Sequence, residues 1–221
     1  MTYQAFIFDL DGVITDTALH HFRAWKMLAD RLSIPFDEHD NEKLKGVGRM
    51  ESLDLILEKG KQTFSLDEKI ALTDKKNADY LELIKSITPA DILPGVTDAF
   101  AILKQKKIRI GLASASKNAT FVVDRLGMLD QFDYIADAAK IPRGKPAPDI
   151  FLDVAKAFGL SSDACVGVED AAAGVDAIKS AKMFAVGIGE PEVLAKADLI
   201  FPSMRAFDVE RILASYSRKA S

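Results

Sequence analysis

Near its start the chain reads Ala5-Phe6-Ile7-Phe8-Asp9-Leu10-Asp11-Gly12-Val13, an apolar run followed directly by two carboxylates. The apolar run predicts a short buried β-strand, and Gly12 permits a sharp turn of the backbone at its end. Because side chains alternate along a strand, Asp9 and Asp11 can face the same side. Two converging carboxylates offer oxygen ligands to a divalent metal, and they also supply a nucleophile and a proton-transfer group.

The overall composition indicates a soluble globular protein. The chain has 221 residues, of which 48% are hydrophobic, and this length suffices to bury a sizeable core. Its 29 basic and 33 acidic residues are dispersed and give a net charge of −4. A surface that binds nucleic acid normally gathers positive charge into a patch, so we expect no nucleic-acid partner. A few local cationic side chains can still bind a phosphate group.

Cysteine usage and hydropathy favour a cytoplasmic protein. Cys165 is the single cysteine, so no intramolecular disulfide can form, and its apolar neighbours predict a buried, inert thiol. No apolar run approaches the roughly 20 residues needed to span a bilayer. The first residues also lack the basic region of a signal peptide. We therefore expect a cytoplasmic location and no membrane partner.

Strand-like and helix-like patterns alternate along most of the chain. Such alternation predicts βαβ units and a parallel sheet covered by helices on both faces. Ligands of such sheets bind beyond the carboxyl ends of the strands, so the residues after each apolar run are the candidates for chemistry. The strands are expected at 5–8, 108–113, 134–136, 165–168, 184–188 and 199–201, and the helices between them at 96–104, 120–126, 149–158 and 173–180.

The segment between the first and second strands is different, because its apolar residues recur at helical spacing only. We expect an α/β core of residues 1–15 and 92–221, with a helical cap of residues 16–91 inserted after the first strand. Hinges near 15–17 and 88–94 would let the cap open and close over the strand ends. Trp25 and Met27 are expected in the core of the cap. Helices in the cap are predicted at 18–32, 42–46, 50–59 and 66–87.

Three later strand ends also carry polar groups, namely residues 114–118 (Ser-Ala-Ser-Lys-Asn), Lys145 between Gly144 and Pro146, and the pair Glu169-Asp170. Each has an ordinary interpretation: serines cap helices, most lysines are solvated, and acids complement a helix dipole. Each also has a functional one. Hydroxyl and backbone N–H groups can cradle a phosphate, a lysine held before proline has a restricted backbone, and an acidic pair can complete a Mg²⁺ site.

In this order, the segments 9–13, Ser114, Lys145 and 169–170 resemble the four motifs of the haloacid dehalogenase superfamily, over essentially the whole chain. The stretches 15–18, 21–25, 44–49, 86–94 and 113–118 are similar to those of β-phosphoglucomutases. Gly48 departs from the serine expected in that cap loop. The resemblance implies a Rossmann-like, doubly wound parallel sheet with an α-helical cap.

The resemblance also implies an activity, the interconversion of β-D-glucose 1-phosphate and β-D-glucose 6-phosphate through β-glucose 1,6-bisphosphate. Asp9 would be the nucleophile that becomes phosphorylated, and Asp11 the general acid and base. One Mg²⁺ would be held by Asp9, the main-chain carbonyl of Asp11, Glu169 and Asp170. The implied substrate-binding residues are His21, Gly46, Val47, Arg49, Ser114, Ala115, Ser116, Lys117, Asn118 and Lys145.

Three alternatives stay open on the sequence alone. A Mg²⁺-dependent sugar-phosphate phosphatase would use the same core but would need one phosphate site, whereas a mutase needs two. A phosphonatase lacks support, because we find no match to its cap lysine. A non-catalytic phosphosugar-binding protein would gain nothing from the pair Asp9 and Asp11. The preferred sugar stays open, and since one core and one cap can form a complete site, we expect a monomer.

Overall fold

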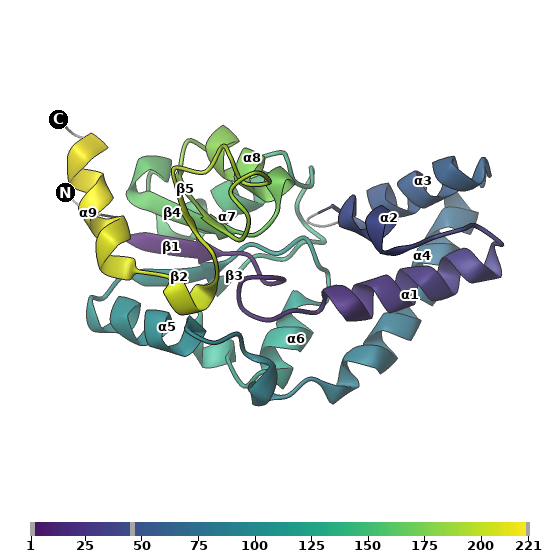
Figure 1. Cartoon of the computed structure of the whole chain (residues 1–221), viewed down its shortest axis with the longest axis horizontal. Coiled ribbons are helices and arrows are strands. Elements are labelled where there is room, and N and C mark those ends of the chain that lie inside the picture. Colours follow the sequence, from purple (N-terminus) through teal and green to yellow (C-terminus); the bar gives the residue numbers. More distant parts are fainter. Residues whose placement is uncertain (1–2, 45–46, 220–221) are drawn as a thin grey trace.

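The computed structural model describes residues 3–44 and 47–219, and from residue 216 onward only the backbone. Its centre is a parallel sheet with the strand order β3-β2-β1-β4-β5-β6 (Figure 1). All neighbouring strands in it run parallel. The strands are β1 (Ala5–Phe8), β2 (Arg109–Leu112), β3 (Tyr134–Ile135), β4 (Cys165–Glu169), β5 (Phe184–Ile188) and β6 (Leu199–Phe201).

Helices cover both faces of this sheet because the side chains of its strands alternate between two apolar cores. Phe6 and Phe8 pack into one core, with residues of α5 (Val96–Gln105), α6 (Ala119–Arg125) and α9 (Val209–Lys219). Ala5 and Ile7 point the other way, into a core shared with α7 (Asp149–Phe158) and α8 (Ala172–Ser180). The predicted doubly wound α/β fold is confirmed, and each predicted strand lies within one residue of its expected ends.

The strand order places the candidate residues together. The chain passes from β1 to β2 on one side and reaches β4 on the other side of β1, so the direction of winding reverses between β1 and β4. The register pairs Phe8 with Val168, and the Asp9 N–H donates to the Val168 carbonyl at 2.9 Å. Asp9 and Glu169 therefore leave the sheet side by side, at the place where α/β sheets bind ligands.

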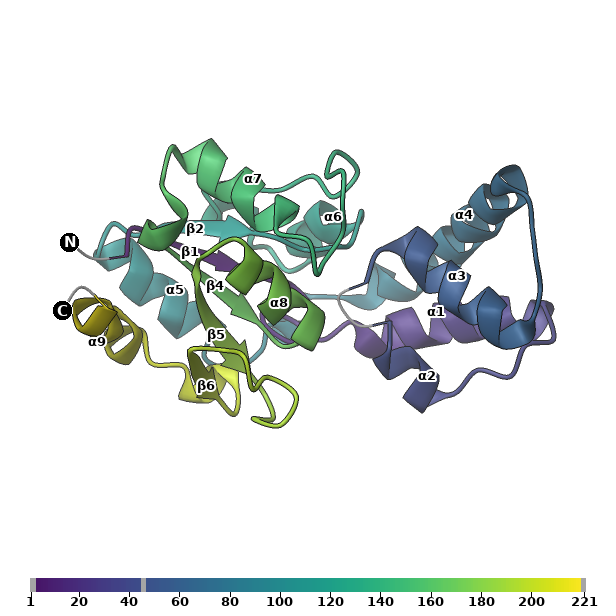
Figure 2. The same cartoon turned by 90° about the horizontal axis from the view of Figure 1, so that it is seen from above.

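A lobe of helices lies beyond the carboxyl ends of the strands, and the described ends of the chain lie on the opposite side (Figures 1 and 2). It contains α1 (Ala18–Arg31), α2 (Glu38–Glu42), α3 (Arg49–Gly60) and α4 (Leu66–Leu83). Trp25, Leu28, Leu53 and Leu57 contribute to a separate apolar core inside the lobe. Within residues 3–44 and 47–219, no helix is both long and apolar enough to cross a bilayer.

Two stretches of backbone connect the lobe to the sheet, and they are tied to each other. Thr15 forms bridges to Asp11 and to Ile92, and the Leu93 N–H donates to the Ile14 carbonyl at 2.9 Å. The Thr15 hydroxyl donates to the Asp91 carbonyl at 2.8 Å. The predicted cap boundaries, after residue 15 and before residue 92, fall within this paired region and stay a prediction.

Some expectations for local structure are wrong. The helix predicted at 42–46 instead starts at Glu38 and ends at Glu42, because Asp37 and Asp40 form a reciprocal capping box at its start. Residues 43–44 form a turn, and 45–46 lie outside the described residues. Met27, expected in the core of the cap, is 40% exposed. The C-terminal helix α9 was not predicted.

The aromatic packing against β1 leads to a stability prediction. Phe100 is 1% exposed, and its ring centroid lies 5.0 Å from that of Phe8. Replacing Phe100 with alanine is expected to lower the free energy of unfolding by about 3–5 kcal/mol, because it leaves a cavity in the core. Urea denaturation followed by circular dichroism measures the loss. The control is Phe121→Ala in α6, since Phe121 is 39% exposed and its loss should be well under half as large. Equal losses would contradict the assignment of the core.

Candidate active site

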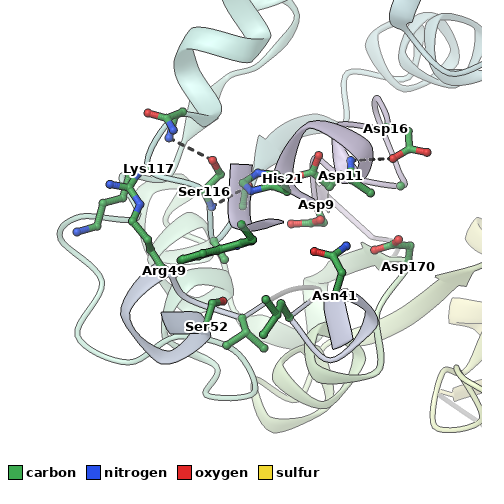
Figure 3. A pocket seen from close by; sticks show the side chains of 18 of the residues that line it. Asp9, Asp11, Asp16, His21, Asn41, Arg49, Ser52, Ser116, Lys117 and Asp170 are labelled. Carbon is green, nitrogen blue, oxygen red and sulfur yellow. Dashed lines mark hydrogen bonds and ion pairs between the residues drawn. The ribbon is translucent and has the colours of Figure 1, made fainter. Parts of the chain in front are cut away.

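A cavity of about 170 Å³ lies between the carboxyl ends of the strands and the helical lobe. Both parts of the molecule contribute side chains to it, and Figure 3 shows acidic groups at one end and cationic and hydroxyl groups at the other. The core contributes Asp9, Asp11, Gly12, Ser114, Ala115, Ser116, Lys117, Asn118 and Asp170, and the segment 16–91 contributes Asp16, Ala18, His21, Trp25, Asn41, Leu44, Val47, Arg49, Ser52 and Lys76.

At the acidic end, Lys145 is buried between two carboxylates. Its Nζ donates to Asp9 Oδ1 at 2.7 Å and to Glu169 Oε1 at 2.6 Å, and neither the Lys145 nor the Glu169 side chain is exposed. Burial by itself lowers the pKa of Lys145, but the charges of Asp9 and Glu169 outweigh it and raise that pKa above the usual value. Lys145 is therefore a permanent positive charge beside Asp9. Burial, reinforced by Glu169 and opposed by Lys145, raises the pKa of Asp9 to about 6.

Three acids at this end can hold a divalent cation. Asp9, Glu169 and Asp170 each offer a carboxylate oxygen, and these atoms all lie within 4.8 Å of one another. Oxygen ligands of this kind suit Mg²⁺. Two glycines make room for them: a Cβ on Gly12, which has φ +71°, would lie 2.0 Å from Asp170 Oδ2, and one on Gly174 would lie 1.8 Å from Glu169 Oε1. Ligation by the Asp11 carbonyl stays a prediction.

Asp11 lies beside this acidic cluster and is oriented by Thr17. The Thr17 N–H donates to Asp11 Oδ1 at 3.1 Å, and the Thr17 hydroxyl donates to the same oxygen. Asp11 Oδ2 lies 4.0 Å from Nε2 of His21. Burial and the Asp9 charge raise the pKa of Asp11 to about 6, against the hydrogen bonds from Thr17. A carboxyl group with such a pKa can both give and take a proton near neutral pH.

His21 is held by a buried lysine of α4. Nζ of Lys76 lies 3.0 Å from Nδ1 of His21 and over the rings of Trp25 and Tyr80, at 4.5 and 4.8 Å from their centroids. Burial and the neighbouring cations Lys76 and Arg49 hold the pKa of His21 well below its usual value. Burial and the Arg49 charge also lower the pKa of Lys76, to about 7. When Lys76 is protonated it can only donate, and in that state Nδ1 of His21 accepts and Nε2 carries the ring proton, facing Asp11. From the sequence, Lys76 matches a residue on the cap face of β-phosphoglucomutases, with a solvated face of a lysine-rich helix as the equal alternative. Lys76 is 2% exposed, so the solvated alternative is wrong.

The opposite end of the cavity is suited to an anion. Arg49, Ser116 and Lys117 gather there, away from Asp9 and Asp170 (Figure 3). The segment after β2 coils so that Ser114 Oγ accepts from the Ser116 N–H at 3.1 Å, and Ser116 Oγ accepts from the Asn118 N–H at 3.2 Å. Guanidinium, ammonium and hydroxyl groups together form the chemistry of a phosphate site.

Of the expected site residues, all but three line this cavity. Lys145 and Glu169 are buried behind Asp9 rather than in the cavity wall, and Gly46 lies outside the described residues. The cavity wall also contains Asn41 and Ser52, which sequence reasoning missed. Ser52 had a detectable signal, because it follows Arg49 by three residues on one helix and so shares its face. Asn41 had no such signal, because the helix was predicted at 42–46 and Asn41 therefore lay outside it.

Comparison with known proteins agrees with this geometry. Residues 3–182 match the family model of the haloacid dehalogenase-like hydrolases. The β-phosphoglucomutase of Bacillus subtilis is 49% identical over 199 residues, which cover 89% of this chain and 88% of that protein. A phosphorylated carbohydrates phosphatase of Thermotoga maritima is 31% identical over 80% of this chain and 81% of its own length. The crystal structure of β-phosphoglucomutase from Clostridium difficile matches with a TM-score of 0.96 and 49% identity, covering 99% of both chains. The chain therefore belongs to the haloacid dehalogenase-like hydrolases and, within them, to the β-phosphoglucomutase family.

Proposed function

We propose that this chain is a Mg²⁺-dependent β-phosphoglucomutase, which interconverts β-D-glucose 1-phosphate and β-D-glucose 6-phosphate through β-glucose 1,6-bisphosphate. The observation that carries the proposal is that one cavity has two ends whose side chains suit a phosphate group, with Asp9 at one end and Arg49 at the other. A bisphosphate intermediate requires both ends, whereas hydrolysis of one phosphate requires only the first. The family membership of the chain supports the same conclusion.

Asp9, Glu169 and Asp170 fit a divalent cation and would hold it, together with the main-chain carbonyl of Asp11. When bound, Mg²⁺ supplies positive charge that offsets the repulsion between the Asp9 carboxylate and an anionic phosphate. Lys145 adds a second positive charge at 2.7 Å from Asp9 Oδ1 and restrains that carboxylate. The other Asp9 oxygen is then available to attack phosphorus.

In the first half-reaction Asp9 forms a bond to phosphorus while the bond from phosphorus to the sugar oxygen breaks. Asp11 gives its proton to that departing oxygen and later takes one from the sugar hydroxyl that attacks the aspartyl phosphate. Thr17 holds one oxygen of Asp11 through its N–H and hydroxyl groups, and Nε2 of His21 lies 4.0 Å from the other oxygen. In this mechanism Asp9 carries the phosphoryl group, and Asp11 transfers the protons.

In the second half-reaction the other phosphate of the sugar bisphosphate must face Asp9. The phosphate that is not being transferred then occupies the end formed by Arg49, Ser116, Lys117 and Asn118. Closure of the helical lobe about the paired segments near Thr15 and Ile92 would exclude water, so that the aspartyl phosphate is returned to sugar. We treat residues 16–91 as the cap that moves.

A sugar-phosphate phosphatase is the second candidate, and the identity of 31% to the Thermotoga maritima phosphatase favours it. Such an enzyme would share Asp9, Asp11 and Lys145, with water as the acceptor. It would have no need for a second phosphate end. A monomeric state and a cytoplasmic location stay predictions from the sequence, and sedimentation at assay concentration tests the first.

The mutase predicts a specific product balance. With β-glucose 1-phosphate, Mg²⁺ and a trace of β-glucose 1,6-bisphosphate, we expect glucose 6-phosphate to form without an equivalent amount of free phosphate, because the acceptor is the sugar. A coupled dehydrogenase assay measures glucose 6-phosphate, and a colorimetric assay measures phosphate. Free phosphate as the main product would support the phosphatase instead.

Arg49 tests the second phosphate end. Arg49→Ala is expected to lower mutase kcat/KM by about 10–100-fold, because a charge-assisted hydrogen bond to phosphate contributes about 1.5–3 kcal/mol. Phosphorylation of Asp9 by acetyl phosphate, which has no second phosphate, should change less than threefold. The control is Arg31→Ala, since Arg31 pairs with Asp79 on the lobe and does not line the cavity. Equal losses in both assays would show that Arg49 acts on the first site or on the fold.

A further inference from the structure

Asn77 of α4 joins three elements at the phosphate end of the cavity. Its Oδ1 accepts from Nη2 of Arg49 at 2.8 Å and from Nδ2 of Asn118 at 2.7 Å. Arg49 begins α3 in the helical lobe, whereas Asn118 precedes α6 on the core. Asn77 itself is not among the residues that line the cavity. A single carboxamide oxygen thus links the lobe to the core beside the second phosphate end.

The chemistry of the donors determines the orientation of this amide. A guanidinium group has only N–H donors, so the Asn77 atom facing Arg49 must be the oxygen. The same oxygen then receives the Asn118 side-chain NH₂ group, which turns the Asn118 oxygen away from Asn77. Arg49 and Asn118 are therefore both oriented by one acceptor.

The acceptor at position 77 is neutral, and this matters for phosphate binding. Among the described residues, Arg49 makes its one side-chain hydrogen bond with Asn77, and none of their ion pairs includes it. The charge of Asp74 acts on Arg49 without an ion pair between the two, and the guanidinium keeps most of its five N–H donors for a ligand. A carboxylate at position 77 would pair with Arg49 and compete with phosphate for the same donors.

Asn77 also connects the two ends of the cavity through α4. The preceding residue, Lys76, contacts His21 and so belongs to the end that contains Asp11. Lys76 and Asn77 are adjacent on α4 but contact different groups. Lys76 contacts His21, which lies beside Asp11, whereas Asn77 accepts a hydrogen bond from Asn118 of the core. The hydrogen bond from Asn118 to Asn77 can form only when α4 lies against the loop after β2.

We propose that Asn77 is a positioning residue and a closure latch for the phosphate that is not being transferred. Its oxygen aligns Arg49 and Asn118, ties the helical lobe to the core, and leaves the guanidinium charge available to the substrate. The proposal rests on the proposed function, since it assigns Arg49 and Asn118 to one phosphate of the sugar bisphosphate.

The first test is Asn77→Asp, which preserves shape and the acceptor oxygen but adds a negative charge. We expect the KM for β-glucose 1,6-bisphosphate to rise at least tenfold, with kcat, the melting temperature and phosphorylation of Asp9 by acetyl phosphate little changed. A KM within twofold of the unsubstituted enzyme would overturn the argument from charge. The control on the same helix is Lys75→Ala, whose side chain is 58% exposed and pairs with Asp79.

The second test is Asn77→Ala, which removes the acceptor. We expect a lower mutase kcat/KM and a larger fraction of aspartyl phosphate lost to water, because the latch no longer favours the closed lobe. Equal losses in mutase activity, acetyl-phosphate reaction and melting temperature would show a merely structural role and overturn the proposal.

The product balance and the Asn77 variants distinguish a failure of the proposed function from a failure of the role of Asn77. If the unsubstituted enzyme releases free phosphate as its main product, the proposed function fails and the role of Asn77 fails with it. If the unsubstituted enzyme is a mutase and both Asn77 variants match it, only the role of Asn77 fails.

Discussion

Lys145 between Asp9 and Glu169 is the interaction on which the rest of the site depends. The strand order places Asp9 and Glu169 side by side at the reversal point of the sheet, where two carboxylates would repel each other. An unexposed ammonium within 2.7 Å of both relieves that repulsion. Removing one partner of such a buried network typically costs about 3–5 kcal/mol, because the remaining charge stays buried and unpaired. The same charge that stabilises the fold therefore prepares Asp9 for an anionic substrate.

Space around these acids is as important as charge. Gly12 and Gly174 allow the carboxylates of Asp170 and Glu169 to approach their backbones, at positions where any Cβ would overlap a carboxylate oxygen. The crowding of three acids around one point then follows from backbone shape rather than from the acids alone. A cation bound there would offset the remaining negative charge.

The division of the molecule into a sheet and a helical lobe separates two tasks. The sheet holds the acidic end rigidly, because its strands are buried on both faces. The lobe has its own apolar core and contributes Arg49, His21 and Lys76 from three helices. Under the proposed closure of the cap, these side chains move together relative to Asp9. Under the proposed function, phosphoryl transfer belongs to the sheet, whereas choice of acceptor belongs to the contact between sheet and lobe.

The sequence by itself determined the α/β architecture, since alternating strand and helix patterns with polar residues after the strands allow few other folds. It also identified Asp9, Asp11, Ser114, Lys145 and Asp170, because each follows a strand or turn whose position can be read locally. The resemblance also pointed to His21, Val47 and Arg49 of the lobe, whereas only the tertiary structure decided how Lys76 and Asn77 meet the site. Lys76 and Asn77 lie on a helix rich in charged residues, and no periodicity distinguishes a lysine that faces His21 from one that faces water. Contacts between segments as distant as Asn77 and Asn118 depend on how the helical lobe packs against the sheet, which local patterns do not encode.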